Sequence, residues 1–457
     1  TNPTILSGDL DENDGGGTGA NARWYNMTDN SYVVVTGSNI RLPATIDGFT
    51  ITRGSTSSGF SGSGMSLSFC SDIQISQCRI IENISQNAAG ILSSASNTTL
   101  LNCYLEDNYA FSGRGGAIYH SGDWQDRSIH YTLTVHNSTF LANRASTGSG
   151  SASGGAIYSS FEGPVEVDGC LFENNRADWR FSSGNQTAYG GAMLIFGQGS
   201  RISNSTFRGN SALAAGAIWI ARDTQVVNCL FVKNEAFRLS VGIYDYGGFA
   251  GAIYAPGSTS QTNTALIDHC TFHANTARNV GGVWGNPNLT ISNSILYTNT
   301  STEVEATLLD QQLSGDPIIL NSCVKGLLTL DNGNINFDPI FVDQDGTDNI
   351  TGNSDDDLHL SNGSPCIDAG NDAAFPSFMP TIDFDGNPRI QDDPLSFGSA
   401  TDMGAYEFIP GSGTGGSNAL PIASFTHSIG TVNEVTFTDT STDSDGSIVQ
   451  WIWNFGD

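Results

Sequence analysis

Short runs of alternating apolar and polar residues recur along most of the chain. Nearly the same short sequence motif, which we call the glycine phrase, accompanies them each time. The clearest copy is Gly115-Gly116-Ala117-Ile118-Tyr119. Further copies begin at Gly154, Gly190, Ala215, Ala250 and Gly281. Two-residue periodicity predicts short β-strands, and the glycines predict a sharp corner before a strand whose small residue points into a narrow core.

A second phrase separates these copies: an aliphatic strand leads to Cys or Ser, and an Asn follows five residues later. Repeated asparagines at one turn are expected to stack and to hydrogen-bond along the axis, where Asn tolerates left-handed backbone angles. These predicted ladder residues are Asn108, Asn143, Asn175, Asn210, Asn234 and Asn275.

The repeat period of roughly 24 to 41 residues predicts a solenoid or a propeller. No helical periodicity accompanies it, and the shortest unit, 205–229, is too short for a four-stranded blade. It has room for one coil of three short strands and three turns. The chain is therefore predicted to be all-β, a parallel β-helix in which equivalent residues lie ~4.8 Å apart.

Most of the eight cysteines fall on the Cys/Ser position of the repeat. Stacked side chains that point the same way have poor disulfide geometry, so these cysteines are expected to be buried free thiols. The ladder cysteines are Cys78, Cys103, Cys170, Cys229 and Cys270. Cys323 and Cys366 lie outside the ladder, and whether they pair is left open.

The net charge of −29 makes nucleic acid and anionic membranes poor partners for this surface. Calcium or a saline exterior suits it better. The sequence holds no apolar stretch of about 18 residues, so no direct membrane span is expected.

Two acidic loops are candidates for structural calcium binding, because carboxylates alternate there at the spacing of a calcium loop. One contains Asp343, Asp345 and Asp348, with Gly346 permitting the turn. Solvated Asx-turns are the alternative, because no EF-hand helices or distant Glu accompany the loop. The other candidate loop contains Asp9, Asp11, Asn13 and Asp14.

Long insertions leave one corner of the repeat at 144–153, 176–189 and 235–249, and together they are expected to form a ledge. Aromatic side chains on the ledge are candidates for stacking on sugar rings; closing a small core beneath the loops is the alternative. The candidate ligand-binding residues are Trp179, Phe181, Tyr244 and Tyr246.

Four regions are expected along the chain. Residues 1–310 form the β-helix, and residues 311–410 form a cap that hides its open core and last unpaired strand. A Gly/Ser/Thr-rich linker covers 411–418. A new β pattern fills 419–457, and it is expected to be the N-terminal part of a further domain within a longer chain.

The repeats, the Asn2–Asp9 opening and the Ile46–Ile51 strand resemble large secreted bacterial β-helix proteins. The stretch from Asp338-Pro339 to Asp402–Glu407 resembles their choice-of-anchor Q ending. Residues 419–457 resemble the first half of a PKD-type, immunoglobulin-like β-sandwich domain. The resemblance implies a right-handed parallel β-helix in an extracellular or cell-surface protein.

Two classes of function remain after these observations. The first is a non-catalytic module of a large adhesin or surface appendage, acting as a rigid rod with a glycan or cell-surface partner. The second is a carbohydrate-active enzyme, a polysaccharide lyase or hydrolase, since β-helices host both. Candidate bases are few: His120, His130 and His136 cluster around one inserted loop, where a solvated loop is the favoured interpretation. No catalytic residue is assigned, and the oligomeric state is left open.

Overall fold

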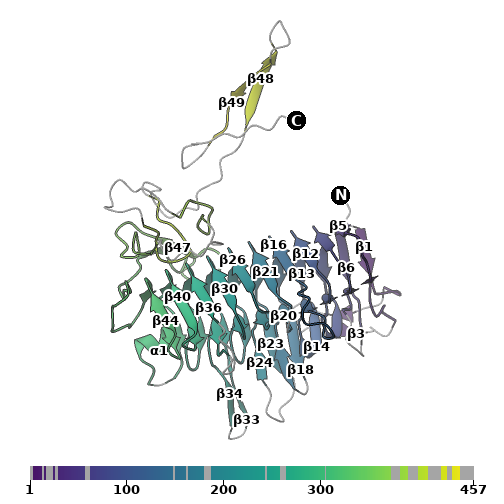
Figure 1. Ribbon diagram of the computed structural model, residues 1–457, viewed down its shortest axis with the longest axis horizontal. Coiled ribbons are helices and arrows are strands. Elements are labelled where there is room, and N and C mark those ends of the chain that lie inside the picture. The colour runs from purple at the N-terminus through teal and green to yellow at the C-terminus, as the bar shows by residue number, and fades with distance from the viewer. Residues whose placement is uncertain are drawn as a thin grey trace.

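The chain folds into a parallel β-helix, in which the backbone winds through the same four sheets in each coil (Figure 1). The computed structural model describes residues 4–12, 15–16, 24–25, 29–56, 62–147, 150–160, 163–179, 187–241, 244–257, 264–303, 305–371, 381–389, 400–409, 424–429 and 435–442. We number the sheets in the order in which the chain visits them. Neighbouring strands in each of the four sheets are parallel, as expected for successive coils.

Sheet 1 carries the strands that follow the glycine corners. Its strands are β4 (Val35–Ser38), β7 (Met65–Ser68), β11 (Ile91–Ser94), β15 (Ile118–Ser121), β20 (Ile157–Ser159), β25 (Met193–Ile195), β29 (Ile218–Ile220), β35 (Ile253–Ala255), β39 (Val283–Gly285) and β43 (Leu313–Ser314). Sheet 2 comprises β5 (Ala44–Asp47), β8 (Ile73–Ser76), β12 (Thr98–Leu101), β16 (Leu133–His136), β21 (Val165–Asp168), β26 (Ser200–Ser203), β30 (Thr224–Val227), β36 (Ala265–Asp268), β40 (Leu289–Ser292) and β44 (Ile318–Leu320).

Sheet 3 lies between the Cys/Ser corner and the Asn corner. Its strands are β1 (Thr4–Ser7), β6 (Phe49–Thr52), β9 (Arg79–Ile81), β13 (Tyr104–Glu106), β17 (Thr139–Leu141), β22 (Leu171–Glu173), β27 (Thr206–Arg208), β31 (Leu230–Val232), β37 (Thr271–His273), β41 (Ile295–Leu296) and β45 (Cys323–Val324). Sheet 4 comprises β10 (Ile84–Asn87), β14 (Tyr109–Arg114), β18 (Arg144–Thr147), β19 (Ser151–Ser153), β23 (Arg176–Trp179), β24 (Thr187–Tyr189), β28 (Ser211–Ala212), β32 (Glu235–Ala236), β38 (Thr276–Ala277) and β42 (Thr300–Ser301).

The expected three strands per coil is therefore wrong: a coil has four. The fourth strand is short in the compact coils, where β28, β32, β38 and β42 have two residues each. A two-residue strand is too short to show a periodicity in the sequence. Only its pairing with the coils above and below identifies it as a strand.

Inward-facing aliphatic residues of sheets 1, 2 and 3 form one continuous core along the axis. In sheet 3 the core also contains a stack of phenylalanines, with adjacent ring centroids 4.6–4.9 Å apart and nearly parallel planes. The stack comprises Phe140, Phe172, Phe207, Phe231 and Phe272. Each is the apolar residue two positions after the Cys or Ser of the repeat.

The asparagines of the repeat lie one above the other at the corner between sheets 3 and 4, and all are buried. Asn143 shows the pattern: its Oδ1 accepts hydrogen bonds from both the backbone N–H (3.2 Å) and Nδ2 (2.9 Å) of Asn108 in the preceding coil. Asn108 Nδ2 also donates to the carbonyl of Ile80. The same bonds recur from Asn83 to Asn299, so each coil satisfies the polar groups of the one before it.

The left-handed residue at this corner is the one before the asparagine, which corrects the expectation that Asn itself takes left-handed angles. Asp107, Ala142 and Lys233 have φ values of 49°, 54° and 54°. Asn108 and its equivalents avoid positive φ, because their side chains must point inward to reach the next coil. A similar left-handed residue precedes the Cys/Ser position, as at Asn102 and Asn228.

The Cys/Ser position forms a second ladder at the corner between sheets 2 and 3. Cys103 N–H donates to Ser138 Oγ at 3.0 Å, and Cys170 N–H donates to Ser205 Oγ at 3.0 Å. Cys103 Sγ donates in turn to the carbonyls of Leu101 and Ile75. All eight cysteines are buried free thiols in this structure.

The glycine phrase marks a corner where coils approach too closely for a side chain. Gly154 has φ of 62°, and a Cβ on Gly155 would meet the carbonyl oxygen of Gly191 at 2.0 Å. Ala156, the next residue, is fully buried in the core. The phrase therefore combines a left-handed turn, a close backbone approach and a small inward residue.

Helix α1 (Leu308–Gln312) and the coil after it close the C-terminal end of the solenoid. Gln312 takes the place of the next ladder asparagine: its Oε1 accepts from Asn299 N–H and Nδ2, and its Nε2 donates to the carbonyl of Asn299. Leu309 and Leu327 pack against the end of the core. The sheets themselves continue to Val324, so the β-helix extends beyond the boundary expected at residue 310.

The rest of the expected cap packs on the side of the solenoid rather than over its end, which corrects its predicted position. We call the described part of residues 336–409 the lateral cap. Leu358 and Ala405 pack on Leu230 and Val232, the outward residues of β31. Arg389, buried in the lateral cap, donates to Ala405 O (2.9 Å) and to Asn228 Oδ1. In Figure 1 this region, marked by β47, lies over the C-terminal coils.

Within the described part of the chain, four two-stranded antiparallel sheets lie outside the solenoid ladders. They pair β2 (Gly15–Gly16) with β3 (Trp24–Tyr25), β33 (Arg238–Val241) with β34 (Tyr244–Gly247), β46 (Phe341–Asp343) with β47 (Asp357–Leu360), and β48 (Phe425–Ile429) with β49 (Val435–Asp439). The β48–β49 hairpin lies within the region expected to begin an immunoglobulin-like sandwich, and it agrees with a β-rich unit there.

Candidate binding surface

Two of the three predicted insertions stack side by side. Strands β14, β19 and β24 pair in parallel, with Arg114 opposite Ser153 and Ser153 opposite Tyr189. The insertions at 144–153 and 176–189 thereby widen sheet 4. The insertion at 235–249 behaves differently, because it forms the β33–β34 hairpin that projects from the solenoid (Figure 1).

Trp179 is half-buried and packs, together with Phe237, against a small cluster that includes Ala177, Ala212 and Leu213. The neighbouring Asp178 is buried and forms ion pairs with Arg144 (2.7 Å) and Arg176 (2.7 Å). These contacts hold the insertions to the solenoid. The described part of the ledge thus has a packing role.

The remaining ledge candidates cannot be placed as side chains. Phe181 lies outside the described residues. Tyr244 and Tyr246 belong to β34, of which only the backbone is described. Glycan binding by Trp179, Phe181, Tyr244 and Tyr246 stays a prediction.

A second set of aromatic residues, absent from the sequence-based candidates, lies on the outer side of sheet 1. It occupies one register position in successive coils, next to the inward isoleucines. We call it the aromatic row: Tyr119, Tyr158, Trp219, Tyr254 and Trp284. Leu194 holds the same position between Tyr158 and Trp219. The sequence contained a signal for this row, because its residues come at the end of the repeated glycine phrase.

The rings of the row contact one another along the solenoid axis. Ring centroids are 5.0 Å apart for Tyr119 and Tyr158 and 4.9 Å apart for Tyr254 and Trp284. Trp219 lies at 70° to Tyr254, an edge-to-face arrangement, and its ring centre is 3.6 Å from that of Tyr189. Four members are partly exposed and Tyr158 is buried.

Side chains from the sheet 4 side flank the row. The Arg114 guanidinium lies 5.3 Å from the ring centre of Tyr158, and Phe249, which is 41% exposed, packs beside Tyr254. Burial raises the pKa of Tyr158 to about 12, so its hydroxyl stays neutral at physiological pH. The surface therefore combines aromatic rings, a neutral phenol and an exposed cation.

The two predicted calcium loops form different local structures. Asp9 is buried and pairs with Arg53 Nη1 at 2.9 Å, which neutralises its charge. The backbone N–H of Asp11 donates to Asp29. Asn13 and Asp14 lie outside the described residues.

In the second loop, the Asp348 carboxylate is engaged by the loop itself. Asp348 Oδ1 accepts from the backbone N–H of Ile350 at 2.8 Å, an Asx-turn. Asp355, which was not among the candidates, accepts from Thr347 Oγ1 at 2.8 Å. Buried His273 of the solenoid contacts the carbonyl of Gln344 at 3.0 Å and so anchors the loop.

No group of three His, Cys, Asp or Glu side chains positioned to hold a metal occurs among the described residues. The donor set of the Asp343–Asp348 loop thus does not converge as folded. Calcium binding at either loop stays a prediction. Likewise, no helix in the described ranges is both long and apolar enough to cross a membrane.

The histidines with described hydrogen bonds serve the fold. His120, expected in a solvated loop, is instead fully buried, and its Nε2 lies 2.8 Å from the carbonyl of Tyr131. Burial lowers the pKa of His120 to about 4. His269, also buried, contacts Thr401 Oγ1 of the lateral cap at 2.9 Å. Each ring thus holds a loop or the cap against the solenoid.

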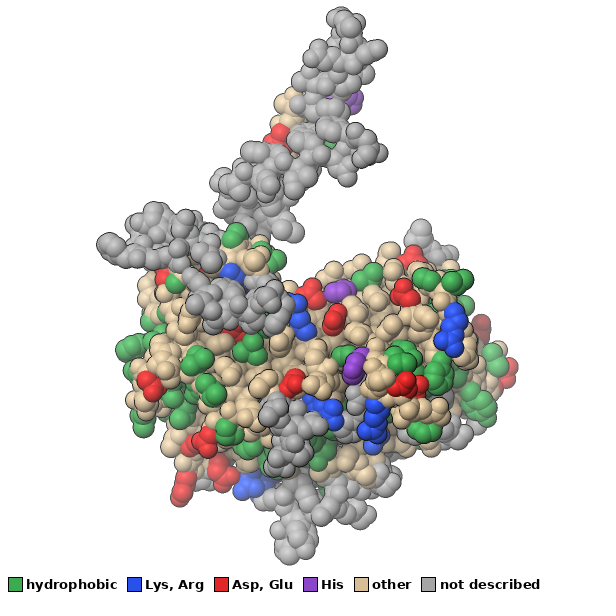
Figure 2. Space-filling model, in the orientation of Figure 1, with side chains coloured by type: hydrophobic (Ala, Val, Ile, Leu, Met, Phe, Trp, Pro, Cys, Tyr) green, Lys and Arg blue, Asp and Glu red, His purple; other side chains and the backbone are tan. Residues whose placement is uncertain are grey.

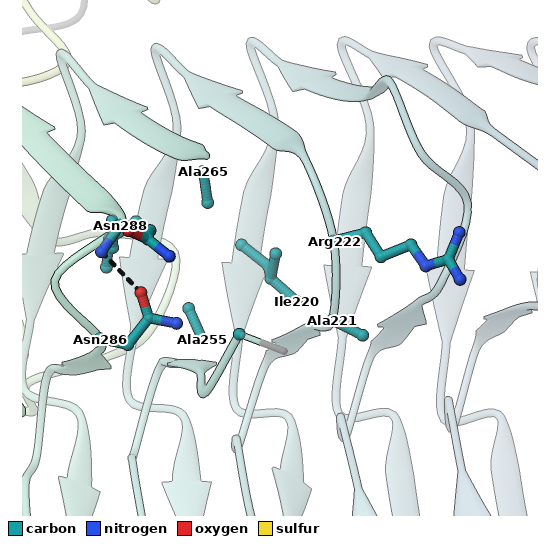
Figure 3. A pocket seen from close by; sticks show the side chains of 9 residues that line it. Ile220, Ala221, Arg222, Ala255, Ala265, Asn286 and Asn288 are labelled. Atoms are coloured by element: carbon teal, nitrogen blue, oxygen red, sulfur yellow. Dashed lines mark hydrogen bonds between the residues drawn. The ribbon is translucent and has the colours of Figure 1, made fainter. Parts of the chain in front are cut away.

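A pocket of about 220 Å³ lies at the corner between sheets 1 and 2 (Figure 3). Ile220, Ala255 and Ala265 line it, and Arg222 extends away from these side chains. Asn286 Oδ1 accepts from the backbone N–H of Asn288 at 2.7 Å, which ties the corner together. That volume includes open solvent. The enclosed space is about 10 Å³, far below usual ligand sites of ~300–1,000 Å³, so an extended surface is the better candidate.

Comparison with known proteins supports the architecture. Residues 12–192 match the family model described as the right handed beta helix region. The matched stretch is part of the solenoid. Together with the parallel sheets, it identifies the fold as a right-handed parallel β-helix. No curated protein matches the chain.

Proposed function

We propose that this chain is a non-catalytic, extracellular module of a large adhesin or surface-appendage protein, a rigid rod that binds an extended glycan along sheet 1. The observation that carries the proposal is the aromatic row, which places Tyr or Trp at one register position in five coils, interrupted once by Leu194. Coils rise by ~4.8 Å, so the row presents a linear, repeating array to a linear, repeating polymer.

The geometry of the rings indicates how a glycan contacts the row. Tyr119 stacks on the buried Tyr158, so the partly exposed Tyr119 offers its ring edge and hydroxyl group. The exposed Phe249 offers its ring to sugar C–H groups. Arg114 adds a hydrogen-bond donor at one end.

Charge narrows the class of ligand. The chain carries 17 Lys and Arg against 46 Asp and Glu, and much of the face in Figure 2 consists of uncharged polar side chains and backbone. Strong polyanions are repelled by such a protein at long range. Neutral or weakly acidic polysaccharides fit it best.

Rigidity follows from the ladders. The asparagine, Cys/Ser and phenylalanine stacks each run through successive coils without a hinge, and every coil hydrogen-bonds to the next. In a solenoid, stability accumulates from such nearest-neighbour interfaces. The arrangement supports the role of a stiff spacer.

A glycan array tests the binding site with three variants. Tyr254→Ala/Trp284→Ala removes part of the row, Trp179→Ala/Tyr244→Ala removes the predicted ledge aromatics, and Trp124→Ala is a control because Trp124 is 77% exposed. We expect the row variant to lose most binding while the control binds like wild type. Loss of glycan binding only in the ledge variant would assign the binding site to the ledge. Equal glycan binding by all folded variants would exclude both surfaces as the binding site.

A further inference from the structure

Cys323 lies in the last strand of sheet 3, where it is opposite Ile295 of the preceding coil. Its Sγ donates to the carbonyl of Phe337 at 3.1 Å, at the start of the lateral cap. The side chain is fully buried. Cys323 therefore sits where the final coil meets the segment that turns back over the side of the solenoid.

Cys366 reaches the same place from the other direction. Ser364 Oγ donates to the carbonyl of Pro339 at 2.6 Å, so the segment containing Cys366 runs beside the segment that Cys323 contacts. The carbonyl of Cys366 accepts from Met403 N–H, and Gly404 N–H donates to Asn293 O in the adjacent coil. These bonds fix Cys366 against the coil that precedes Cys323.

The two thiols meet in one small core. Cys323 and Cys366 share a buried cluster with Ile295, Leu360 and Met403. They come from separate segments that face one another. That approach differs from the ladder, where neighbouring side chains are parallel.

Cys229 and Cys270 are the matched comparison within the chain. They are also neighbours, but they occupy the same ladder position of adjacent coils and point the same way. Cys270 Sγ donates to the carbonyls of Asp268 and Val226, and Cys229 Sγ likewise donates to the carbonyl of Val227, so both thiols are engaged by the backbone of their own corner. A disulfide there would have poor geometry.

We propose that Cys323 and Cys366 form a disulfide that ties the lateral cap to the last coil of the solenoid. The oxidant is a small-molecule disulfide such as oxidised glutathione. One cysteine thiolate attacks it to give a mixed disulfide, and the second displaces the remaining small thiol. The protein loses two protons and two electrons in total, and the oxidant is reduced to two thiols.

The step belongs to folding rather than to the closed native state. The neighbouring Cys366 thiol, together with burial, raises the pKa of the Cys323 thiol well above its usual range. The thiolate is the reactive form, so the reaction is fast only before the cap closes. Such a link forms in an oxidising compartment and agrees with, but does not depend on, the proposed binding role.

The test counts thiols in the full chain. Wild-type protein is refolded with oxidised and reduced glutathione, then unfolded in an alkylating reagent and digested for mass spectrometry. We expect six alkylated cysteines out of eight, with one cross-linked peptide pair that joins Cys323 to Cys366. The Cys229→Ser/Cys270→Ser variant, if folded, should keep that link; the Cys323→Ser/Cys366→Ser variant should contain none.

A second measurement tests whether the disulfide stabilises the docked lateral cap. Limited proteolysis of oxidised wild type should cut the lateral cap more slowly than the same protein reduced before refolding. Eight alkylated cysteines in correctly folded protein, or a link that joins ladder cysteines, would overturn the proposal. Equal cutting rates for oxidised and reduced protein would overturn the claim that the disulfide ties down the cap.

Discussion

Each ladder asparagine in the middle of the row holds two backbone groups and one side-chain amide of the preceding coil. Asn175, in the middle of the row, accepts from Asn143 N–H and Nδ2 through Oδ1, while its Nδ2 donates to the carbonyl of Phe140. All of these atoms are buried, so the loss of one side chain leaves several polar groups without partners.

We therefore expect Asn175→Ala to lower the free energy of unfolding by about 2–4 kcal/mol. The matched control is Asn288→Ala, because Asn288 is exposed and its described hydrogen bond comes from its backbone N–H. Its effect should stay within about 0.5 kcal/mol. Urea denaturation measures both, and similar values for the two variants would contradict the ladder's role.

His359 in the lateral cap makes stability depend on pH. Burial opposes its charge, but hydrogen bonds with Asp357 (2.6 Å) and Asp385 (2.7 Å) outweigh burial and raise its pKa to about 9. A raised folded-state pKa gives stabilisation that is complete below about 6.5, the usual value, and is lost as pH rises through about 9.

The thermal midpoint of the cap is accordingly expected to fall between pH 7 and 9.5 in wild type, with a flatter profile in His359→Gln. Amide hydrogen exchange in the β46–β47 region measures the same loss of stability with rising pH locally. A wild-type profile as flat as that of the variant would show that the His359 ion pairs do not stabilise the cap.

Residue types and spacing indicated the ladder positions because solenoid coils repeat the same local environment. The fixed interval from Cys103 to Asn108, for example, encloses one strand and its two corners. The sequence could not show that Asp107, rather than Asn108, takes the left-handed angle, since both residue types tolerate it. The burial of His120 could not be predicted from the sequence either, because it depends on a loop that folds back over the imidazole ring.

Among the contacts between the lateral cap and the solenoid, one involves the buried guanidinium of Arg389. Arg389 donates to Glu407 Oε1 at 2.8 Å, to two backbone carbonyls and to Asn228 of the solenoid. Removing one member of a buried ion pair leaves the other charge uncompensated, which costs about 3–5 kcal/mol.

Arg389→Ala should therefore release the lateral cap while the coils stay folded. Limited proteolysis should cut the cap faster, with the β-sheet circular dichroism unchanged. The double variant Arg389→Ala/Glu407→Gln removes the stranded charge and should recover part of the protection. Cap resistance equal to wild type in the single variant would contradict this docking role.

The acidic loop at Asp343–Asp348 is the element on which calcium is predicted to act. A ligand that binds only the folded state raises the melting midpoint, so calcium should raise it and a chelator should lower it. Asp345→Asn/Asp348→Asn should abolish the difference. Identical midpoints with and without chelator at low salt would assign these carboxylates to Asx-turns alone.

The sequence did not predict those strands and segments whose structure depends on contacts with neighbouring coils. Strands such as Ser211–Ala212 are too short to show a two-residue period, and only pairing with adjacent coils makes them strands. The lateral cap was recognised as a region, but its place on sheet 3 depends on contacts such as Ala405 N–H to Thr271 Oγ1 across the fold. Neither feature has a local sequence signal.

At the scale of the whole molecule, the right-handed β-helix presents different surfaces on different sides. The lateral cap covers the outer face of sheet 3 over the C-terminal coils, and the insertions widen sheet 4. The aromatic row follows sheet 1 from Tyr119 to Trp284. Function is therefore expected to depend on the length of solenoid that a ligand can span.

The central claim is that the aromatic row binds a linear glycan and leaves it intact. Calorimetric titration with a length series of the best oligosaccharide from the array, followed by mass spectrometry of the recovered ligand, tests it most directly. We predict that affinity rises with ligand length until the row is filled, falls in Tyr254→Ala/Trp284→Ala, and leaves every oligosaccharide at its original mass. Affinity independent of length, or ligand recovered as shorter products, would contradict the account.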